Sequence, residues 1–113
     1  MRKFLRSTKF ALKGLKTVFL TEKSFRLHIL VAIPVILFAW YWGLSETYWI
    51  ILLLVIALVM ALEIFNSAIE RLVDILAPKT HGAAREIKDI LAAMVLLVVI
   101  FAIAIGLIIF FVN

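Results

Sequence analysis

The strongest chemical signal in this sequence is a set of four polar residues at helical spacing: Glu63, Asn66, Glu70 and Asp74. Successive members are three or four residues apart, so on a helix they share one face, within an arc of about 60°. They directly follow an uncharged run, residues 47–62, so the first of them is expected inside a membrane. Carboxylates at that depth are costly, about 2.5–3.5 kcal/mol each on insertion scales, and are therefore functional candidates.

The chemistry of such a set depends on depth. Oxygen ligands at a membrane surface suit Mg²⁺, which keeps several waters and bridges to phosphates. A carboxylate set deeper suits a general base acting on a molecule dissolved in lipid. With basic residues nearby, these features describe phosphoryl transfer to a lipid alcohol. Two other interpretations stay open on spacing alone: a polar seam that holds an oligomer together, and a proton or cation path in a small transporter.

Several other chemistries are disfavoured. The chain has no cysteine, so it has no disulfide, no thiolate metal site and no cysteine nucleophile. Its four glycines form neither of the glycine-rich phosphate loops of P-loop proteins and nucleotide-binding folds. The two histidines, His28 and His81, have no second histidine at metal-binding spacing, so zinc is not predicted. His28 is interpreted as a capping or interfacial residue beside the first apolar run.

The elements that must position these residues are membrane helices. Of the 113 residues, 66% are hydrophobic and 17% are charged, whereas soluble domains are nearer half apolar and a quarter charged. A bilayer core of about 30 Å needs about 20 helical residues. The sequence predicts an all-α integral membrane protein with one domain, residues 1–113. Its predicted spans are residues 27–45, 47–75 and 88–112, with a cytoplasmic loop at residues 76–87.

Charge is distributed unevenly along the chain. The net charge is +5, and eight of the 12 basic residues lie within residues 1–26. A basic pole indicates nucleic acid or an anionic membrane surface as partner; the apolar runs favour the membrane and not nucleic acid. Residues 1–25 are predicted to form an amphipathic surface helix, with basic residues along one stripe. The positive-inside rule places the N-terminus and the 76–87 loop in the cytoplasm.

Residues 63–74, EIFNSAIERLVD, resemble the signature of the prokaryotic diacylglycerol kinase family, which has five polar positions at fixed spacing in an apolar window. Three further motifs are similar to that family: residues 22–26 (EKSFR), the pair Lys88-Asp89, and residues 13–15 (KGL). The resemblance covers nearly the whole chain. It implies a surface helix plus three transmembrane helices, assembled as a homotrimer in the bacterial cell membrane, with active sites between subunits at the cytoplasmic face.

The resemblance also implies an activity and its residues. The enzyme would be a lipid kinase that takes ATP as co-substrate, with Mg²⁺, and phosphorylates a lipid alcohol. Glu63 would be the general base, Asn66 would orient that base or a phosphate, and Glu22 and Glu70 would hold Mg²⁺. The nucleotide would be contacted by five residues: Lys3, Phe10, His81, Lys88 and Asp89. Lys3 and Phe10 stand where the best-known members have arginine and tyrosine.

The family divides mainly into diacylglycerol kinases and undecaprenol kinases. Arg26-Leu27-His28 resembles the Gram-positive form of the motif that precedes the first span. We therefore expect undecaprenol as the favoured acceptor. The alternative is diacylglycerol, which would give phosphatidic acid, and a more distant alternative is a small membrane transporter without kinase activity.

Overall fold

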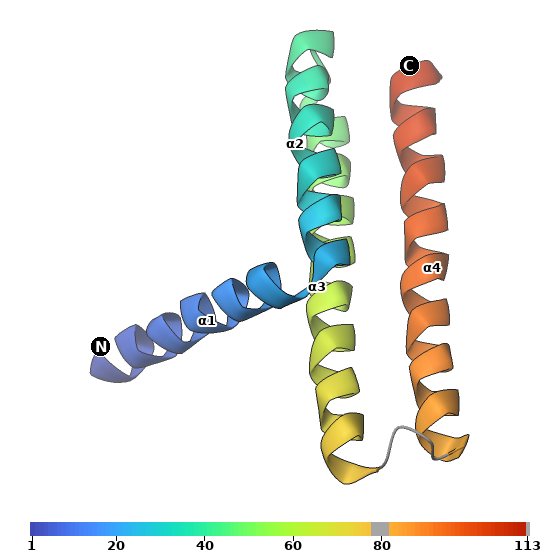
Figure 1. Ribbon diagram of the computed structural model, residues 1–113. Helices are drawn as coiled ribbons and strands as arrows, with labels where there is room; N and C mark the ends of the chain where they lie inside the picture. Colours follow the sequence, from blue (N-terminus) through green and yellow to red (C-terminus); the bar gives the residue numbers. More distant parts are fainter. Residues whose placement is uncertain (78–81, 113) are drawn as a thin grey trace.

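The computed structural model describes residues 1–77 and 82–112 of the chain (Figure 1). Four helices account for nearly all of them: α1 (Arg2–Thr21), α2 (Lys23–Trp42), α3 (Glu46–Leu76) and α4 (Gly82–Phe111). No strand occurs among the described residues. The all-α fold with one N-terminal helix and three long apolar helices is therefore confirmed.

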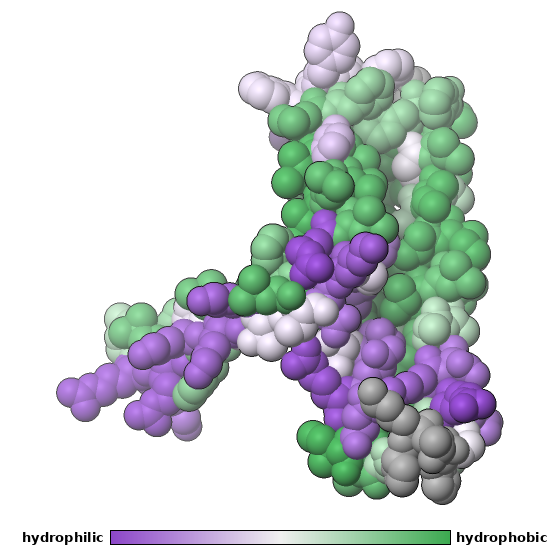
Figure 2. All heavy atoms as spheres, in the orientation of Figure 1, coloured by the Kyte–Doolittle hydropathy of each residue, from purple (hydrophilic) through white to green (hydrophobic). Residues whose placement is uncertain are grey.

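The three apolar helices form a bundle, and α1 projects sideways from it (Figure 1). Each of α2, α3 and α4 is long and apolar enough to cross a membrane. Hydrophobic side chains cover most of the half of the bundle next to the α2–α3 turn, with residues of intermediate hydropathy at the turn itself, whereas hydrophilic side chains gather on α1 and toward the opposite end (Figure 2). The protein is thus a multi-pass membrane protein whose polar groups gather at one membrane surface.

Helix α3 is longer than the membrane is thick. Its 31 residues span about 46 Å at about 1.5 Å per residue, against a hydrocarbon core of about 30 Å. Glu63 lies about 26 Å along this helix from Glu46, so it is just inside the far edge of the core when the helix starts at the near edge. The last turns of α3 extend beyond the lipid and carry the polar face predicted from the sequence.

The α2–α3 turn is closed by a glycine. Gly43 adopts the left-handed conformation, with φ 75° and ψ 48°, a backbone region that residues with a side chain rarely adopt. Its N–H group donates to the carbonyl oxygens of Ala39 and Trp40, at 3.1 and 3.3 Å. Beside the turn, Ala39, Leu52 and Ile109 form a small buried core, which brings the end of α4 to this end of the bundle.

Several helix bounds differ from the expected ranges. The surface helix ends at Thr21 and α2 begins at Lys23, with Glu22 between them in an extended conformation, φ −108° and ψ 107°. Helix α4 begins at Gly82, so residues 82–87 are helical and do not belong to a loop. Hydropathy marks where a helix enters lipid, whereas residues 83–86 are mostly good helix formers that extend the helix beyond the membrane.

Very little of the apolar surface is buried within one chain. Among the described residues the buried apolar side chains are few and scattered over all four helices. Two polar residues are buried with them, Glu63 at 5% exposure and Ser67 at 3%. Since a charged group is rarely buried without a partner, these two residues lead to the functional site.

Candidate active site

Glu63 is held by two side chains of α2. The hydroxyl of Ser24 donates to Glu63 Oε2 at 3.0 Å, and His28 Nδ1 is in contact with Glu63 Oε1. Ser24 and His28 are four residues apart, so they lie on the same face of α2, one turn from each other. The deepest carboxylate of the α3 polar face is therefore anchored to the first span.

Glu22 is held at the α1–α2 elbow, which we define as Thr21 and Glu22. The Ser67 hydroxyl donates to Glu22 Oε1 at 2.9 Å. Arg71, one turn further along α3, donates from Nη2 to Thr21 Oγ1 at 2.7 Å and lies 3.8 Å from Glu22 Oε1. Because the elbow residue Glu22 is outside both helices, its carboxylate can turn toward α3 instead of following the face of either helix.

Asn66 connects the remaining acidic residue of the site. Its Nδ2 donates to Glu70 Oε1 at 3.3 Å, across one turn of α3. Its other polar atom, Oδ1, is buried and has no hydrogen-bond partner among the described residues. Buried polar atoms are nearly always partnered, so this oxygen is an acceptor that a ligand can use.

These groups surround a cavity of about 340 Å³, the polar cavity. One wall carries Glu22, Ser24 and His28, and the next carries Glu63 and Asn66. The α4 wall is apolar and consists of Ala92, Val95, Leu96 and Val99. The volume is enough for several water molecules or a small polar group, with two carboxylates and an amide among its polar lining.

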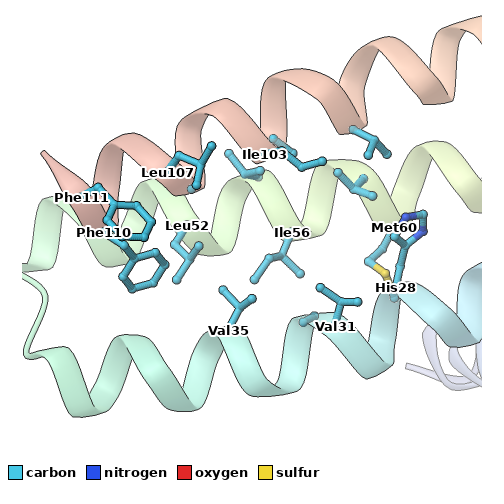
Figure 3. Close-up of a pocket in the computed structure, with 16 residues that line it drawn as sticks. His28, Val31, Val35, Leu52, Ile56, Met60, Ile103, Leu107, Phe110 and Phe111 are labelled. Atoms are coloured by element: carbon cyan, nitrogen blue, oxygen red, sulfur yellow. The ribbon is translucent and has the colours of Figure 1, made fainter.

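A second cavity of about 300 Å³, the apolar groove, runs between α2, α3 and α4 (Figure 3). His28 and Met60 lie at one of its ends, and Phe110 and Phe111 lie at the other (Figure 3). His28 and Val99 line both cavities. The two cavities therefore meet at His28, where an apolar channel within the membrane reaches the polar residues at its edge.

Lys88 and Asp89 lie near the start of α4. Lys88 Nζ donates to Asp74 Oδ1 on α3 at 2.6 Å, and Asp89 is exposed. Ala92 of the polar cavity is four residues after Lys88, so it lies one turn away on the same face. A cation and a carboxylate thus lie about one turn before the α4 wall of the polar cavity.

Comparison with known proteins decides the family. A profile of the family described as prokaryotic diacylglycerol kinase matches residues 9–110. The chain belongs to this family. It is 33% identical to the undecaprenol kinase of Bacillus subtilis over 110 residues, which cover 97% of this chain and 89% of that protein.

Two diacylglycerol kinases are similar as well. Over 85 residues the chain is 35% identical to the protein of Haemophilus influenzae, with 75% of this chain and 72% of that one covered. Over 101 residues it is 28% identical to the protein of Escherichia coli, with 89% and 83% covered. This protein is a membrane lipid kinase, and as a kinase it uses ATP. The family and the enzyme class expected from the sequence are confirmed.

The kinase does not bring every expected nucleotide residue to the polar cavity within one chain. Lys3 and Phe10 are exposed on α1, and α1 points away from the bundle (Figure 1). At about 1.5 Å per residue they lie about 28 and 18 Å along the helix from Glu22. Lys88 and Asp89 lie about one turn before the α4 wall of the cavity and do not line it, and His81 is outside the described residues.

The carboxylates of the kinase suit a cation that is shared with phosphates. No group of three histidine, aspartate or glutamate residues that could hold a metal occurs within residues 1–77 and 82–112. Mg²⁺ is usually bound by one or two carboxylates plus waters and phosphate oxygens, without a full protein cage. Glu22 and Glu70 are joined to the adjacent residues Ser67 and Asn66, and the open Asn66 Oδ1 adds a hard oxygen. This donor set fits Mg²⁺.

Sequence reasoning missed four residues of the kinase site: Ser24, His28, Ser67 and Arg71. His28 does not cap a helix, because it lies within α2 and pairs with Glu63. One signal was available, since Ser24 and His28 share a face of α2 immediately after Glu22. Nothing in the sequence indicates that this face meets Glu63, because that depends on how α2 and α3 are rotated against each other.

Proposed function

We propose that the kinase transfers the γ-phosphate of ATP directly to the primary hydroxyl of a membrane lipid alcohol, with Glu63 as general base. The observation that carries this proposal is the position of Glu63, buried where the apolar groove meets the polar cavity. The lipid chain of the acceptor would lie in the apolar groove, and its hydroxyl would enter the polar cavity. A lipid alcohol needs an apolar groove for its chain and a polar cavity for its hydroxyl side by side.

The placement of the side chains supports the following course for the reaction. Glu63 takes the proton of the lipid hydroxyl as the hydroxyl oxygen forms its bond to the γ-phosphorus, and the bond to the ADP oxygen breaks in line with it. Asn66 would orient the incoming groups through its amide. Lys88, about one turn before the α4 wall of the cavity, would leave Asp74 to meet phosphate charge, and Asp89 would help to place the nucleotide.

Glu22 and Glu70 would hold Mg²⁺, which would neutralise charge on the ATP phosphates. The donor set supports this role, because it offers two carboxylates and one open amide oxygen. The chain itself supplies rigidity here, since Ser67 holds Glu22 and Asn66 holds Glu70.

We favour undecaprenol as the acceptor, with diacylglycerol as the alternative. Two observations support this preference: the Arg26-Leu27-His28 motif, and the similarity to the Bacillus subtilis undecaprenol kinase over nearly the whole chain. The groove accepts an apolar chain of either kind, because its lining beyond His28 is apolar. The choice between the two acceptors therefore requires an experiment.

We also propose a homotrimer with its active sites between subunits and its polar end in the cytoplasm. Large apolar side chains remain exposed along all three spans, so these surfaces are available for helix contacts between subunits. Lys3 and Phe10 lie too far along α1 to reach the polar cavity of their own chain. If the site is shared between subunits, they can instead reach the polar cavity of a neighbouring subunit. The excess of basic residues on α1 supports the cytoplasmic orientation.

The test is a phosphoryl-transfer assay with purified full-length protein in mixed micelles. Undecaprenol and diacylglycerol are offered together with Mg²⁺ and γ-labelled ATP, and the extracted lipids are separated; the Glu63→Gln variant provides the background. Label in undecaprenyl phosphate supports the favoured acceptor, and label in phosphatidic acid supports the alternative. If wild-type protein labels neither lipid, the proposed reaction is wrong.

A further inference from the structure

His28 and Glu63 are each other's only partner at two buried atoms. His28 Nδ1 is in contact with Glu63 Oε1, and neither atom has a hydrogen-bond partner elsewhere among the described residues. The Glu63 side chain is 4% exposed and the His28 side chain is 27% exposed. Such a pair, at the edge of the hydrocarbon core, is shielded from the water that weakens ion pairs at protein surfaces.

No other basic side chain is positioned to replace His28 in the described parts of the chain. Arg26 donates to the carbonyl oxygen of Phe19, Arg71 is engaged at the α1–α2 elbow, and Lys88 is paired with Asp74. The remaining side chains around the polar cavity are acidic, neutral polar or apolar: Glu22, Ser24, Asn66, Ala92, Val95, Leu96 and Val99. Glu70, also acidic, accepts a hydrogen bond from Asn66 Nδ2.

A buried general base has two requirements, a fixed orientation and a stabilised charge. An unpartnered carboxylate in an apolar environment is strongly disfavoured, and a hydrogen bond to an ionised acceptor is about twice as strong as one between neutral groups. Ser24 holds Oε2 and His28 faces Oε1. Each carboxylate oxygen has two lone pairs, so one remains on each oxygen to accept the proton of a substrate hydroxyl.

We propose that His28 is a positioning residue, which carries a proton on Nδ1 and holds the Glu63 carboxylate toward a hydroxyl arriving from the apolar groove. This proposal rests on the proposed function, in which Glu63 is the base. The location of His28 supports it, because His28 lines both the apolar groove and the polar cavity. A hydroxyl at the end of a chain in the groove reaches Glu63 beside this imidazole.

Kinetics of paired variants test the role. His28→Asn keeps a neutral N–H donor close to the position of Nδ1, whereas His28→Leu keeps the bulk and removes the donor. A positioned base contributes about 10²–10⁴-fold, so losing its orientation should lower kcat about 10- to 100-fold in His28→Leu. We expect kcat within about threefold of wild type in His28→Asn, and an unchanged KM for MgATP in both. Leu30→Ala, at an exposed position of the same helix, is the matched control.

A second measurement does not depend on turnover. In protein labelled with ¹⁵N at its two histidines, the His28 signal is identified by its loss in His28→Leu. We expect a protonated Nδ1 in wild type and a changed Nδ1 signal in Glu63→Leu, while Leu30→Ala leaves it unchanged. An unprotonated Nδ1, or one insensitive to Glu63, overturns the proposal.

The outcomes for the two proposals are distinguishable. Wild-type kcat in His28→Leu, together with an inactive Glu63→Gln variant, overturns the role of His28 and leaves the kinase mechanism in place. Equal loss in His28→Asn and His28→Leu also overturns it, because the donor would then not matter. Full activity of Glu63→Gln overturns the assignment of the base and the positioning role with it.

Discussion

Removal of the Arg71 side chain should loosen the α1–α2 elbow and weaken nucleotide binding more than catalysis. Arg71 ties α3 to Thr21 by a hydrogen bond of 2.7 Å and lies 3.8 Å from Glu22 Oε1. A hydrogen bond near the elbow, from Arg26 to the carbonyl oxygen of Phe19, involves only α1 and α2, and the Ser67 hydrogen bond joins α3 to Glu22, which lies outside α1. Arg71→Ala therefore removes the side-chain contact that relates α1 directly to the helix bearing the active-site residues.

The size of the expected effect follows from how exposed the Arg71 and Glu22 side chains are. The Arg71 side chain is 48% exposed and that of Glu22 is 36% exposed, so the ion pair contributes little, at most about 0.5 kcal/mol after solvent screening. The hydrogen bond to Thr21 adds about 0.5–1.5 kcal/mol. A loss of about 1–2 kcal/mol lowers the equilibrium constant between correctly oriented and misoriented α1 by about 5- to 30-fold. We expect KM for MgATP to rise by up to that factor, with kcat at saturating ATP changed less than about threefold.

The assay is an ATP titration of lipid phosphorylation at fixed lipid fraction. Thr21→Val removes the acceptor hydroxyl at nearly constant volume, so a double-mutant cycle with Arg71→Ala isolates the contact. Arg85→Ala, an exposed cation on α4, controls for the loss of one positive charge. Additive effects in the cycle, or an equal rise of KM in Arg85→Ala, would refute the reasoning, because the effect would then come from net charge.

Three other substitutions test the rest of the site and the fold. Glu63→Gln should lower kcat by about 10²–10⁴-fold with little change in MgATP binding; near-normal turnover in mixed micelles contradicts its role as the base. Glu70→Gln should raise the Mg²⁺ concentration needed for half-maximal rate as well as lowering the rate, and an unchanged Mg²⁺ titration counts against a metal-binding role. Gly43→Ala should destabilise the α2–α3 turn by about 1–2 kcal/mol, because φ is 75° there; an unfolding midpoint equal to wild type shows that the turn relaxes.

The polar face of α3 was predictable, and its partners were not. Spacing of three and four residues places Glu63, Asn66 and Glu70 on one face of any regular helix, whatever surrounds it. The contact of Glu63 with Ser24 and His28 depends instead on the rotation and register of α2 against α3. Those are set by the packing of many apolar side chains, and hydropathy treats such side chains as equivalent.

The helix ends also show which features the sequence predicts and which it does not. The cluster of apolar residues in 88–112 predicted a span, but α4 begins at Gly82 because helix formation continues beyond the lipid. Glu22 was predicted to lie at the end of a surface helix. Its extended backbone between α1 and α2 turns its carboxylate to Ser67, and sequence composition gives no indication of that one-residue break.

The sequence alone determines that this chain is a helical membrane protein, because lipid leaves the backbone no other way to satisfy its hydrogen bonds than helices or closed barrels, and its spans have helical length. It also determines that acidic groups lie along one face at the membrane edge, because helical periodicity is local. Only the tertiary structure decides that Glu63 is buried against His28, that Arg71 reaches Thr21, and that the apolar groove meets the polar cavity. The two side-chain contacts join residues 35 and 50 positions apart, and all of these relations depend on how the helices pack against one another.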